Sequence, residues 1–362
     1  MKKIKIPSIL DISFREKGIQ LPSYVFMEET KDIPIILFIF YKLFLMVTAF
    51  MARIRLHMIG SSYKKYQEAP DQNEVERIYT REAITYEVKH HKTTHYRDTW
   101  WRRAIAFDII NFLKESSHQA TLLDIGTGIG LSVEEILRIC RLYQRKIKVV
   151  GIEYNQKMLE QAENVTSLRM RKHNLIIDGE REATFLRVDA RDMTINGDKK
   201  SEFNFFHTNF FDCATIMCGV GGIDTSIKAF QEILTILKPN GILIMLDIHR
   251  PLFHLSEEWP WFIGKKYGPV FSFLGWEDIT KPLVLGSLWG WRDPTPSFYT
   301  SQYAVWHDQK EGMYYGFKKL HFSIMNESWW FGLPVITTAK IILKKEEIER
   351  SEFEKMNSLF SQ

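Results

Sequence analysis

The sequence predicts an α/β fold with a doubly wound, mostly parallel sheet, an N-terminal hydrophobic helix and an aromatic-rich insertion late in the chain. Short β-type runs alternate with helical runs through the middle of the sequence, which implies βαβ crossovers with helices on both faces of the sheet. One of these runs leads straight into a glycine-rich turn and then a helix over residues 122–142. The 362 residues suffice for such a core and for additional segments.

The individual elements follow from local patterns. Apolar residues at helical spacing predict a helix over 99–115, and a second helix is expected over 132–142. The predicted strands are 121–125, 147–152, 184–188, 211–217, 241–248 and, after a long interval, 334–343. The final residues, 344–362, are expected to form a charged surface helix or tail.

These elements suggest four regions. We expect an N-terminal extension over 1–75, a ligand-binding α/β domain over 76–249, an aromatic-rich insertion over 250–333, and a last strand with a charged tail over 334–362. The polar stretch 61–76 is interpreted as a linker into the main domain.

The N-terminal extension contains an almost wholly apolar run at 33–52, IPIILFIFYKLFLMVTAFMA. Its length fits a membrane-spanning helix, a helix lying in the membrane interface, or a helix covering a soluble core. Lys42 disfavours the first, because a charge in mid-bilayer is costly, and apolar residues on every side disfavour the last. We therefore expect membrane association. The basic residues that follow the run place the rest of the chain in the cytoplasm: Arg53, Arg55, Lys64 and Lys65.

Composition excludes several functions. The 48 basic and 44 acidic side chains leave a formal charge of +4, too small to predict nucleic-acid binding. Three cysteines without zinc-type spacing indicate a reducing compartment, and Cys213 and Cys218 are expected to pack in the core. No metal site is expected, because the histidines at 90, 91 and 95 lack an accompanying carboxylate motif.

The strongest motif is LLDIGTGIG at residues 122–130. Glycines let the chain turn sharply and bring its backbone close to a ligand. The third glycine, Gly130, stands one position earlier than in the dinucleotide fingerprint, which would place it at Leu131. The candidate ligand-binding residues of this turn are Asp124, Gly126, Thr127, Gly128 and Gly130.

Later strands end in residues suited to the same ligand. Glu153 follows the second strand, where a carboxylate can accept hydrogen bonds from ribose hydroxyls. Asp189-Ala190 follows the third strand, and Cys218 follows the fourth. A Lys-Pro-Asn-Gly turn at 238–241 precedes the fifth strand.

From Leu122 to His249, this order of features resembles that of class I S-adenosylmethionine-dependent methyltransferases. The resemblance implies S-adenosylmethionine as cofactor, with Asp189 facing the adenine amino group. Upstream, Tyr86-Glu87 followed by Trp101-Arg102 resembles a pair of motifs in quinone-ring C-methyltransferases of ubiquinone and menaquinone synthesis.

His249, after the fifth strand, is the candidate acid–base residue, with a structural histidine as the alternative. Eight of the ten tryptophans lie between Trp259 and Trp330, so this stretch is either a lid over an apolar acceptor pocket or a subdomain with its own core. We expect a lipophilic acceptor: a quinone precursor, a sterol-like or polyprenyl compound, or a phospholipid. A soluble enzyme for a small metabolite and a non-catalytic cofactor-binding scaffold are the alternatives, and the oligomeric state stays open.

Overall fold

The computed structural model describes residues 3–8, 29–34, 36, 72–93, 98–113, 119–194, 206–223, 226–248, 295–330 and 333–359. The chain divides into two compact units. One comprises Met1–Pro70, Ile248–Thr295 and Ser323–Lys340, and the other comprises Asp71–Asp247, Pro296–Phe322 and Ile341–Gln362. The second unit holds the glycine-rich turn and is described first.

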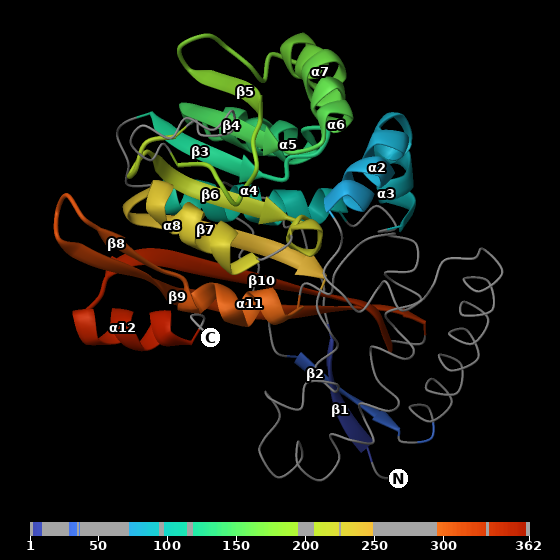
Figure 1. Ribbon diagram of the computed structural model, residues 1–362. Coiled ribbons are helices and arrows are strands. Elements are labelled where there is room, and N and C mark those ends of the chain that lie inside the picture. The colour runs from blue at the N-terminus through green and yellow to red at the C-terminus, as the bar shows by residue number, and fades with distance from the viewer. Residues whose placement is uncertain are drawn as a thin grey trace. The chain divides into compact units, whose positions relative to one another are not determined.

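An eight-stranded sheet has the order β5-β4-β3-β6-β7-β10-β9-β8 (Figure 1). Its strands are β3 Ala120–Ile125, β4 Ile147–Glu153, β5 Arg181–Arg187, β6 Phe211–Met217, β7 Leu237–Ile248, β8 Val305–Asp308, β9 Met313–Trp330 and β10 Leu333–Glu347. The strands β5, β4, β3, β6 and β7 pair in parallel, and β8 pairs with β9 in antiparallel fashion. In the register, Leu122 of β3 lies between Val149 and Cys213. The predicted doubly wound, mostly parallel sheet is confirmed.

The direction of winding reverses at β3. The chain steps from β3 to β4 in one direction and from β6 to β7 in the other. Right-handed crossovers therefore place α5 (Leu131–Leu142) and α8 (Ser226–Ile236) on opposite faces, and α4 (Asp98–Phe112) packs beside α5. Ligands of such sheets bind beyond the carboxyl ends of the strands at this reversal, here between β3 and β6.

The remaining helices of this unit are short. They are α2 Gln72–Glu82, η2 Ala83–Thr85, α3 Tyr86–Thr93, α6 Gln156–Gln161, the π-helical η4 Ala162–Thr166, α7 Ser167–Lys172, η5 Val220–Gly222, η8 Ser301–Tyr303 and α12 Arg350–Ser358. A further short helix, α11 (Thr295–Thr300), begins at the unit boundary.

The core of this unit consists of the central strands and the helix faces against them. Leu122, Leu123, Leu243 and Ile244 have no exposed surface, and Ile136 of α5 is 1% exposed. Burial of such large side chains provides about 1.5–3 kcal/mol each. The predicted core role of Cys213 and Cys218 agrees with their burial, and neither forms a disulfide.

The late part of the chain differs from the expectation. Residues 305–308 and 313–330, assigned to an insertion from the sequence, form β8 and β9 of the sheet. Residues 72–76, assigned to a linker, begin α2. The tail does contain the helix α12, but residues 344–347 continue β10. Alternation in β9 is interrupted by Gly316 and a run of polar residues, so its sequence lacks a clear strand pattern.

One residue assigned to the charged tail is buried. Lys345 of β10 has no exposed surface, and its Nζ donates hydrogen bonds to Asn209 Oδ1 at 2.8 Å and to the Leu237 carbonyl at 2.7 Å. The same Nζ lies 4.3 Å from the ring centroid of Trp306 and 4.6 Å from that of Tyr315. Burial lowers the pKa of Lys345 to about 7, although Asp308 opposes this change.

In the other unit, the described N-terminal residues form a pair of antiparallel strands, β1 (Lys3–Ser8) and β2 (Glu29–Pro34). The prediction of a helix starting at Ile33 is wrong at its first two residues, because Ile33 and Pro34 pair with Ile4 and Lys3. Apart from Ile36, residues 35–52 lie outside the described part of the chain. Within the described ranges, no helix is both long enough and apolar enough to cross a membrane.

Candidate functional site

The glycine-rich turn connects β3 to α5 in a backbone conformation that side chains disfavour. Gly126, Gly128 and Gly130 have φ angles of 64°, 58° and 85°. This left-handed region costs other residues about 1–2 kcal/mol. The Gly130 N–H donates to the Thr127 carbonyl at 2.9 Å, and the Thr127 N–H donates to the Ile152 carbonyl of β4 at 2.9 Å. These bonds close the turn and join it to the neighbouring strand.

The three glycines differ in what surrounds them. A Cβ on Gly130 would lie 2.9 Å from the ring of Phe185, so this glycine permits close packing against β5. A Cβ on Gly126 would lie 3.7 Å from Gly219 Cα, which shows how closely the ends of β3 and β6 approach. A Cβ on Gly128 would meet only side chains, with Met158 Cε nearest at 3.3 Å. The space beside Gly128 is therefore bounded by groups that can move.

Glu153 stands at the carboxyl end of β4 and faces the turn. Its Oε2 accepts a hydrogen bond from the Gly128 N–H at 2.9 Å, and its Oε1 accepts one from the Asn155 N–H at 2.9 Å. Burial raises the pKa of Glu153, while these backbone N–H groups oppose the rise. Each carboxylate oxygen can accept a further hydrogen bond, so an oriented acceptor remains for a ligand.

Asp124 and Thr127 lie deeper than the sequence suggested. Asp124 is 1% exposed, and its Oδ1 accepts a hydrogen bond from the Thr215 hydroxyl of β6 at 2.7 Å. Burial raises the pKa of Asp124 to about 6, although the bond from Thr215 opposes the rise. Thr127 is also buried. Both side chains are therefore buried beneath the turn, where they stabilise its conformation.

Asp189 and Ala190 follow β5, next to the end of β4. The Val188 N–H donates to the Glu153 carbonyl at 3.2 Å, which joins the two strand ends. The Asp189 carboxylate pairs with the Arg191 guanidinium through contacts of 2.6, 2.9 and 3.2 Å. Burial works to raise the pKa of Asp189, but the bonds from Arg191 lower it overall. Asp189 is thus ionised and already oriented by its neighbour.

Cys218 ends β6 beside the turn. It adopts a φ of 51°, its N–H donates to the Leu246 carbonyl at 2.9 Å, and its side chain is buried. Burial and the nearby Asp247 raise the pKa of the thiol, so it is a neutral packing group. Asp247, with no exposed surface, accepts a hydrogen bond from the Val220 N–H at 3.1 Å. This bond fixes the loop that follows Cys218.

A helical cover, which we define as α2, η2 and α3 (residues 72–93), packs over the turn. Tyr79 and Tyr86 pack against a cluster formed by Ala83, Ile129, Leu131 and Met158. Tyr86 Cε1 would lie 4.0 Å from a Cβ on Gly128, so its ring forms one wall beside that glycine. Burial raises the pKa of both tyrosines. These two tyrosines therefore form a neutral, aromatic boundary beside the turn.

The cover is attached to the sheet through Asn155, which is 2% exposed. Its Nδ2 donates to the Glu76 carbonyl at 2.8 Å and to the Thr80 hydroxyl at 2.9 Å. Its Oδ1 caps α6 by accepting hydrogen bonds from Lys157 and Met158 N–H groups. Asn155 is not among the residues predicted from the sequence, although an asparagine before a helix is a common capping signal.

The structure thus gathers most of the predicted residues at one edge of the sheet. The turn, Glu153 and Cys218 meet at the ends of β3, β4 and β6, and Asp189 lies one strand further out. His249 lies outside the described residues. Among the described residues, no cluster of His, Cys, Asp or Glu is arranged to hold a metal ion.

Comparison with known proteins agrees with this geometry. A family model described as a methyltransferase domain matches residues 116–283, which include the turn and every strand end described above. Residues 116–283 belong to the class I S-adenosylmethionine-dependent methyltransferases. The order of the central strands places the glycine-rich turn at the edge where open α/β sheets bind their ligands.

Curated relatives of the methyltransferase act in quinone synthesis. It is 24% identical over 201 residues to a demethylmenaquinone methyltransferase of Porphyromonas gingivalis, covering 55% of this chain and 69% of the relative. It is 20% identical to a ubiquinone/menaquinone biosynthesis C-methyltransferase of Wigglesworthia glossinidia brevipalpis, covering 61% and 74%. A solved SAM-dependent methyltransferase from Methanosarcina mazei has 19% identity and a TM-score of 0.38, covering 66% of this chain and 97% of that structure.

The cofactor of the methyltransferase is S-adenosylmethionine. The residues present fit this molecule. Beside Gly128 the left-handed turn meets only side chains, with Met158 Cε nearest, and Glu153 offers an oriented carboxylate. The aromatic wall of Tyr86 and the ionised Asp189 provide an apolar surface and a second acceptor.

Proposed function

We propose that the methyltransferase holds S-adenosylmethionine over the turn and transfers its methyl group to a lipophilic quinol-type acceptor. The observation that carries the cofactor assignment is the geometry of Glu153 and Gly128. The carboxylate is fixed by two backbone N–H groups and retains lone pairs for the two ribose hydroxyls. This favours Glu153 as the ribose ligand.

The other cofactor contacts follow from position. Gly126 and Gly128 give the amino-acid part of the cofactor access to the backbone. Asp189 and Ala190, at the neighbouring strand end, are the proposed adenine contacts, and Arg191 orients the carboxylate. Asp124, Thr127 and Gly130 are proposed to stabilise the conformation of the turn. The side chains of Asp124 and Thr127 are buried, and Gly130 packs closely against Phe185.

When bound, the sulfonium of the cofactor supplies an already activated methyl group. What the protein must provide is alignment of the acceptor atom and exclusion of water. The buried loop after Cys218, fixed by Asp247, bounds the space on the β6 and β7 side. Tyr86 bounds it on the side of the helical cover. His249 remains the proposed acid–base residue, because it directly follows β7 in the sequence.

The acceptor is proposed from two supports. The relatives named above methylate demethylmenaquinone or act in ubiquinone and menaquinone synthesis, at low identity. The sequence itself carries Tyr86-Glu87 and Trp101-Arg102 ahead of the turn, and a tryptophan-rich stretch after β7. Aromatic side chains give large apolar contact areas, as a prenylated ring requires.

We further propose that the apolar run within residues 33–52 brings the enzyme to a membrane surface. The support is sequence alone: the run is apolar on every side, and basic residues follow it. A quinol with a prenyl tail partitions into the bilayer, so an enzyme docked there would meet its acceptor at high local concentration.

A methyl-transfer assay tests the acceptor. The full chain is incubated with S-adenosylmethionine carrying a deuterated methyl group and with a chemically reduced, short-prenyl 1,4-naphthoquinol in detergent micelles. We expect mass spectrometry to find the label on a ring carbon. A parallel arm offers a mixture of water-soluble metabolites. Label found only in that mixture would overturn the lipophilic acceptor and leave the cofactor site standing.

A further inference from the structure

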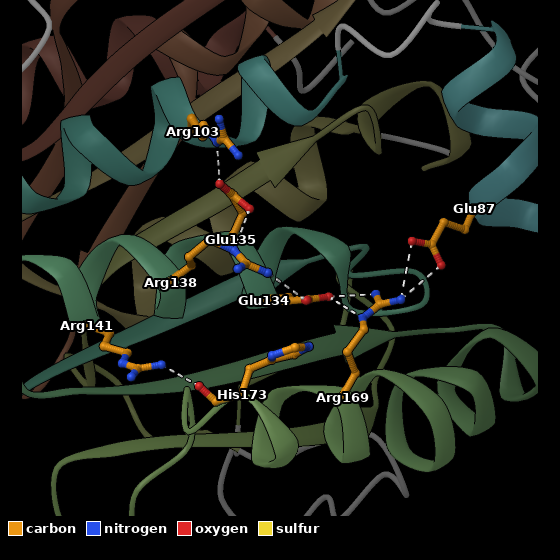
Figure 2. Close-up of polar contacts among 8 residues, drawn as sticks. All are labelled: Glu87, Arg103, Glu134, Glu135, Arg138, Arg141, Arg169 and His173. Carbon is orange, nitrogen blue, oxygen red and sulfur yellow. Dashed lines mark hydrogen bonds and ion pairs between the residues drawn. The ribbon is translucent and has the colours of Figure 1, made fainter. Parts of the chain in front are cut away.

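An alternating chain of charges connects the helical cover to the helices behind the cofactor turn (Figure 2). Three glutamates and three arginines take part: Glu87 on α3, Arg103 on α4, Glu134, Glu135 and Arg138 on α5, and Arg169 on α7. The charges of these six side chains balance.

Arg169 is the member that reaches the cover. Its Nη1 lies 3.2 Å from Glu87 Oε2 and 3.3 Å from Glu87 Oε1, so one guanidinium nitrogen bridges both oxygens. On its other side, Nε and Nη2 contact Glu134 Oε2 at 2.8 and 2.6 Å. Glu134 is buried in the first turn of α5, so the carboxylate that binds this side of the guanidinium is held in a fixed position.

The position of Arg169 is itself tied to the cofactor turn. Three residues earlier, the Thr166 hydroxyl donates to the Ile129 carbonyl at 2.6 Å, and Ile129 stands between Gly128 and Gly130. Thr166 is 1% exposed and closes the π-helical segment that precedes α7. The turn and Arg169 are thereby held in a fixed relation.

Two of the contacts that attach the helical cover differ in kind. At α2, Asn155, which is itself buried, makes two neutral hydrogen bonds. At α3, the Glu87–Arg169 pair is accessible, with side-chain exposures of 36% and 30%. Exposed pairs are weak and are screened by salt, whereas buried hydrogen bonds are costly to leave unmade. Of these two contacts, the Glu87–Arg169 pair is therefore the one that opens more readily, while His90 of α3 lies 3.8 Å from the buried Asp98 of α4.

We propose that Arg169 is a positioning residue that latches α3, and with it Tyr86, over the bound cofactor through its ion pair with Glu87. The latch opens when cofactor enters and product leaves, while Asn155 holds α2 in place. Tyr86 directly precedes Glu87 and walls the space beside Gly128, so movement of α3 changes access to that space. The proposal rests on the cofactor site above and is independent of the acceptor.

Stopped-flow kinetics of S-adenosylhomocysteine binding to the full chain test the latch. The variants are Glu87→Gln, Arg169→Gln and the double variant. We expect each single change to raise the dissociation rate two- to five-fold without lowering the association rate, because a loosened cover opens more often. The double variant should resemble the faster single variant, since both residues act through one contact. Damage to the site itself would instead slow association.

Salt provides a second measurement. Raising NaCl from about 50 to 500 mM should speed dissociation from the wild type, whereas dissociation from Glu87→Gln should change little. Arg138→Gln is the matched control, because Arg138 contacts Glu134 and Glu135 but not Glu87. Its kinetics should match the wild type at both salt concentrations.

The outcomes are separable. If the wild type binds S-adenosylhomocysteine and Glu87→Gln has unchanged dissociation, the latch is overturned and the cofactor site stands. Additive effects in the double variant, or an equal effect of Arg138→Gln, would also overturn it. If the wild type does not bind S-adenosylhomocysteine, the cofactor site fails and the latch fails with it.

Discussion

The carboxylate of Glu153 accepts a hydrogen bond at 2.9 Å from the backbone N–H of Gly128. This contact joins the end of β4 to the middle of the glycine turn, 25 residues apart in sequence. The same carboxylate is therefore both a support of the turn and the proposed ribose ligand. Its two roles can be separated by experiment.

Replacement of Gly128 by valine should abolish binding of S-adenosylhomocysteine, because branched carbons would occupy the space beside the turn. Isothermal calorimetry measures the loss. The fold should survive with about 1–2 kcal/mol less stability, the cost of a side chain at positive φ, since the nearest neighbour is the flexible Met158. Gly130→Ala is the contrasting variant: its Cβ would press on Phe185, so it should lower stability further. Full affinity in Gly128→Val would contradict the assignment.

Replacement of Glu153 by alanine should weaken S-adenosylhomocysteine binding by about 1–3 kcal/mol, the usual cost of deleting a charged hydrogen-bond acceptor. Glu153→Gln keeps the size and part of the support for the turn, and should still lose affinity. Glu182→Ala, a change to a partly exposed residue of neighbouring β5 that pairs with Lys148, is the control and should bind normally. Melting temperatures of all three variants show whether the turn stays folded. Equal affinities would exclude Glu153 as a ligand.

Asp124 should make the stability of the protein fall as pH rises from about 4 to about 6. Its pKa in the folded state is about 6, above the ordinary 3.8, so in this window the folded state binds more protons than the unfolded state. We expect the free energy of unfolding of the wild type, relative to Asp124→Asn, to decrease by about 3 kcal/mol across it. Urea unfolding at several pH values gives the difference. A constant difference would show that Asp124 does not titrate there.

Lys345 should have the opposite effect at higher pH. Its folded pKa of about 7 lies below the ordinary 10.5, so above pH 7 the unfolded state binds more protons and stability rises. Relative to Lys345→Met, the wild type should gain about 2–3 kcal/mol between pH 7 and 9. Lys344→Met, at the adjacent and partly exposed position paired with Glu346, serves as control and should show no such gain. The same pH response in both variants would refute the assignment.

The apolar run should decide membrane binding and leave cofactor binding intact. Residues 37–52 are replaced by a Gly-Ser segment of equal length, which keeps β1, β2 and the main unit. In a flotation assay with anionic vesicles, the wild type should rise with the lipid and the variant should stay in solution. Calorimetry with S-adenosylhomocysteine checks that the variant is folded. Equal flotation of the two proteins, or failure of the wild type to float, would contradict membrane docking through this run.

Much of the fold could be predicted because its signals are local. β6 occupies the predicted residues 211–217, and β3, β4 and α5 differ by one residue at an end. Apolar runs with turn residues between them fix such buried parallel strands. β8 and β9 were missed, since they complete the sheet edge in a stretch whose aromatic composition suggested an insertion.

The candidate site divides in the same way. The sequence by itself determined the glycine turn, because positive φ at Gly126, Gly128 and Gly130 requires glycine, and it determined Glu153, because a strand end fixes where that carboxylate emerges. Only the tertiary structure decided that Asp124 lies buried below the turn, that Asn155 holds the helical cover, and that Arg169 contacts Glu87 across 82 residues of sequence. Backbone conformation depends on the local sequence, residue by residue. These contacts depend instead on which distant helices pack together, and local sequence patterns do not indicate which helices do so.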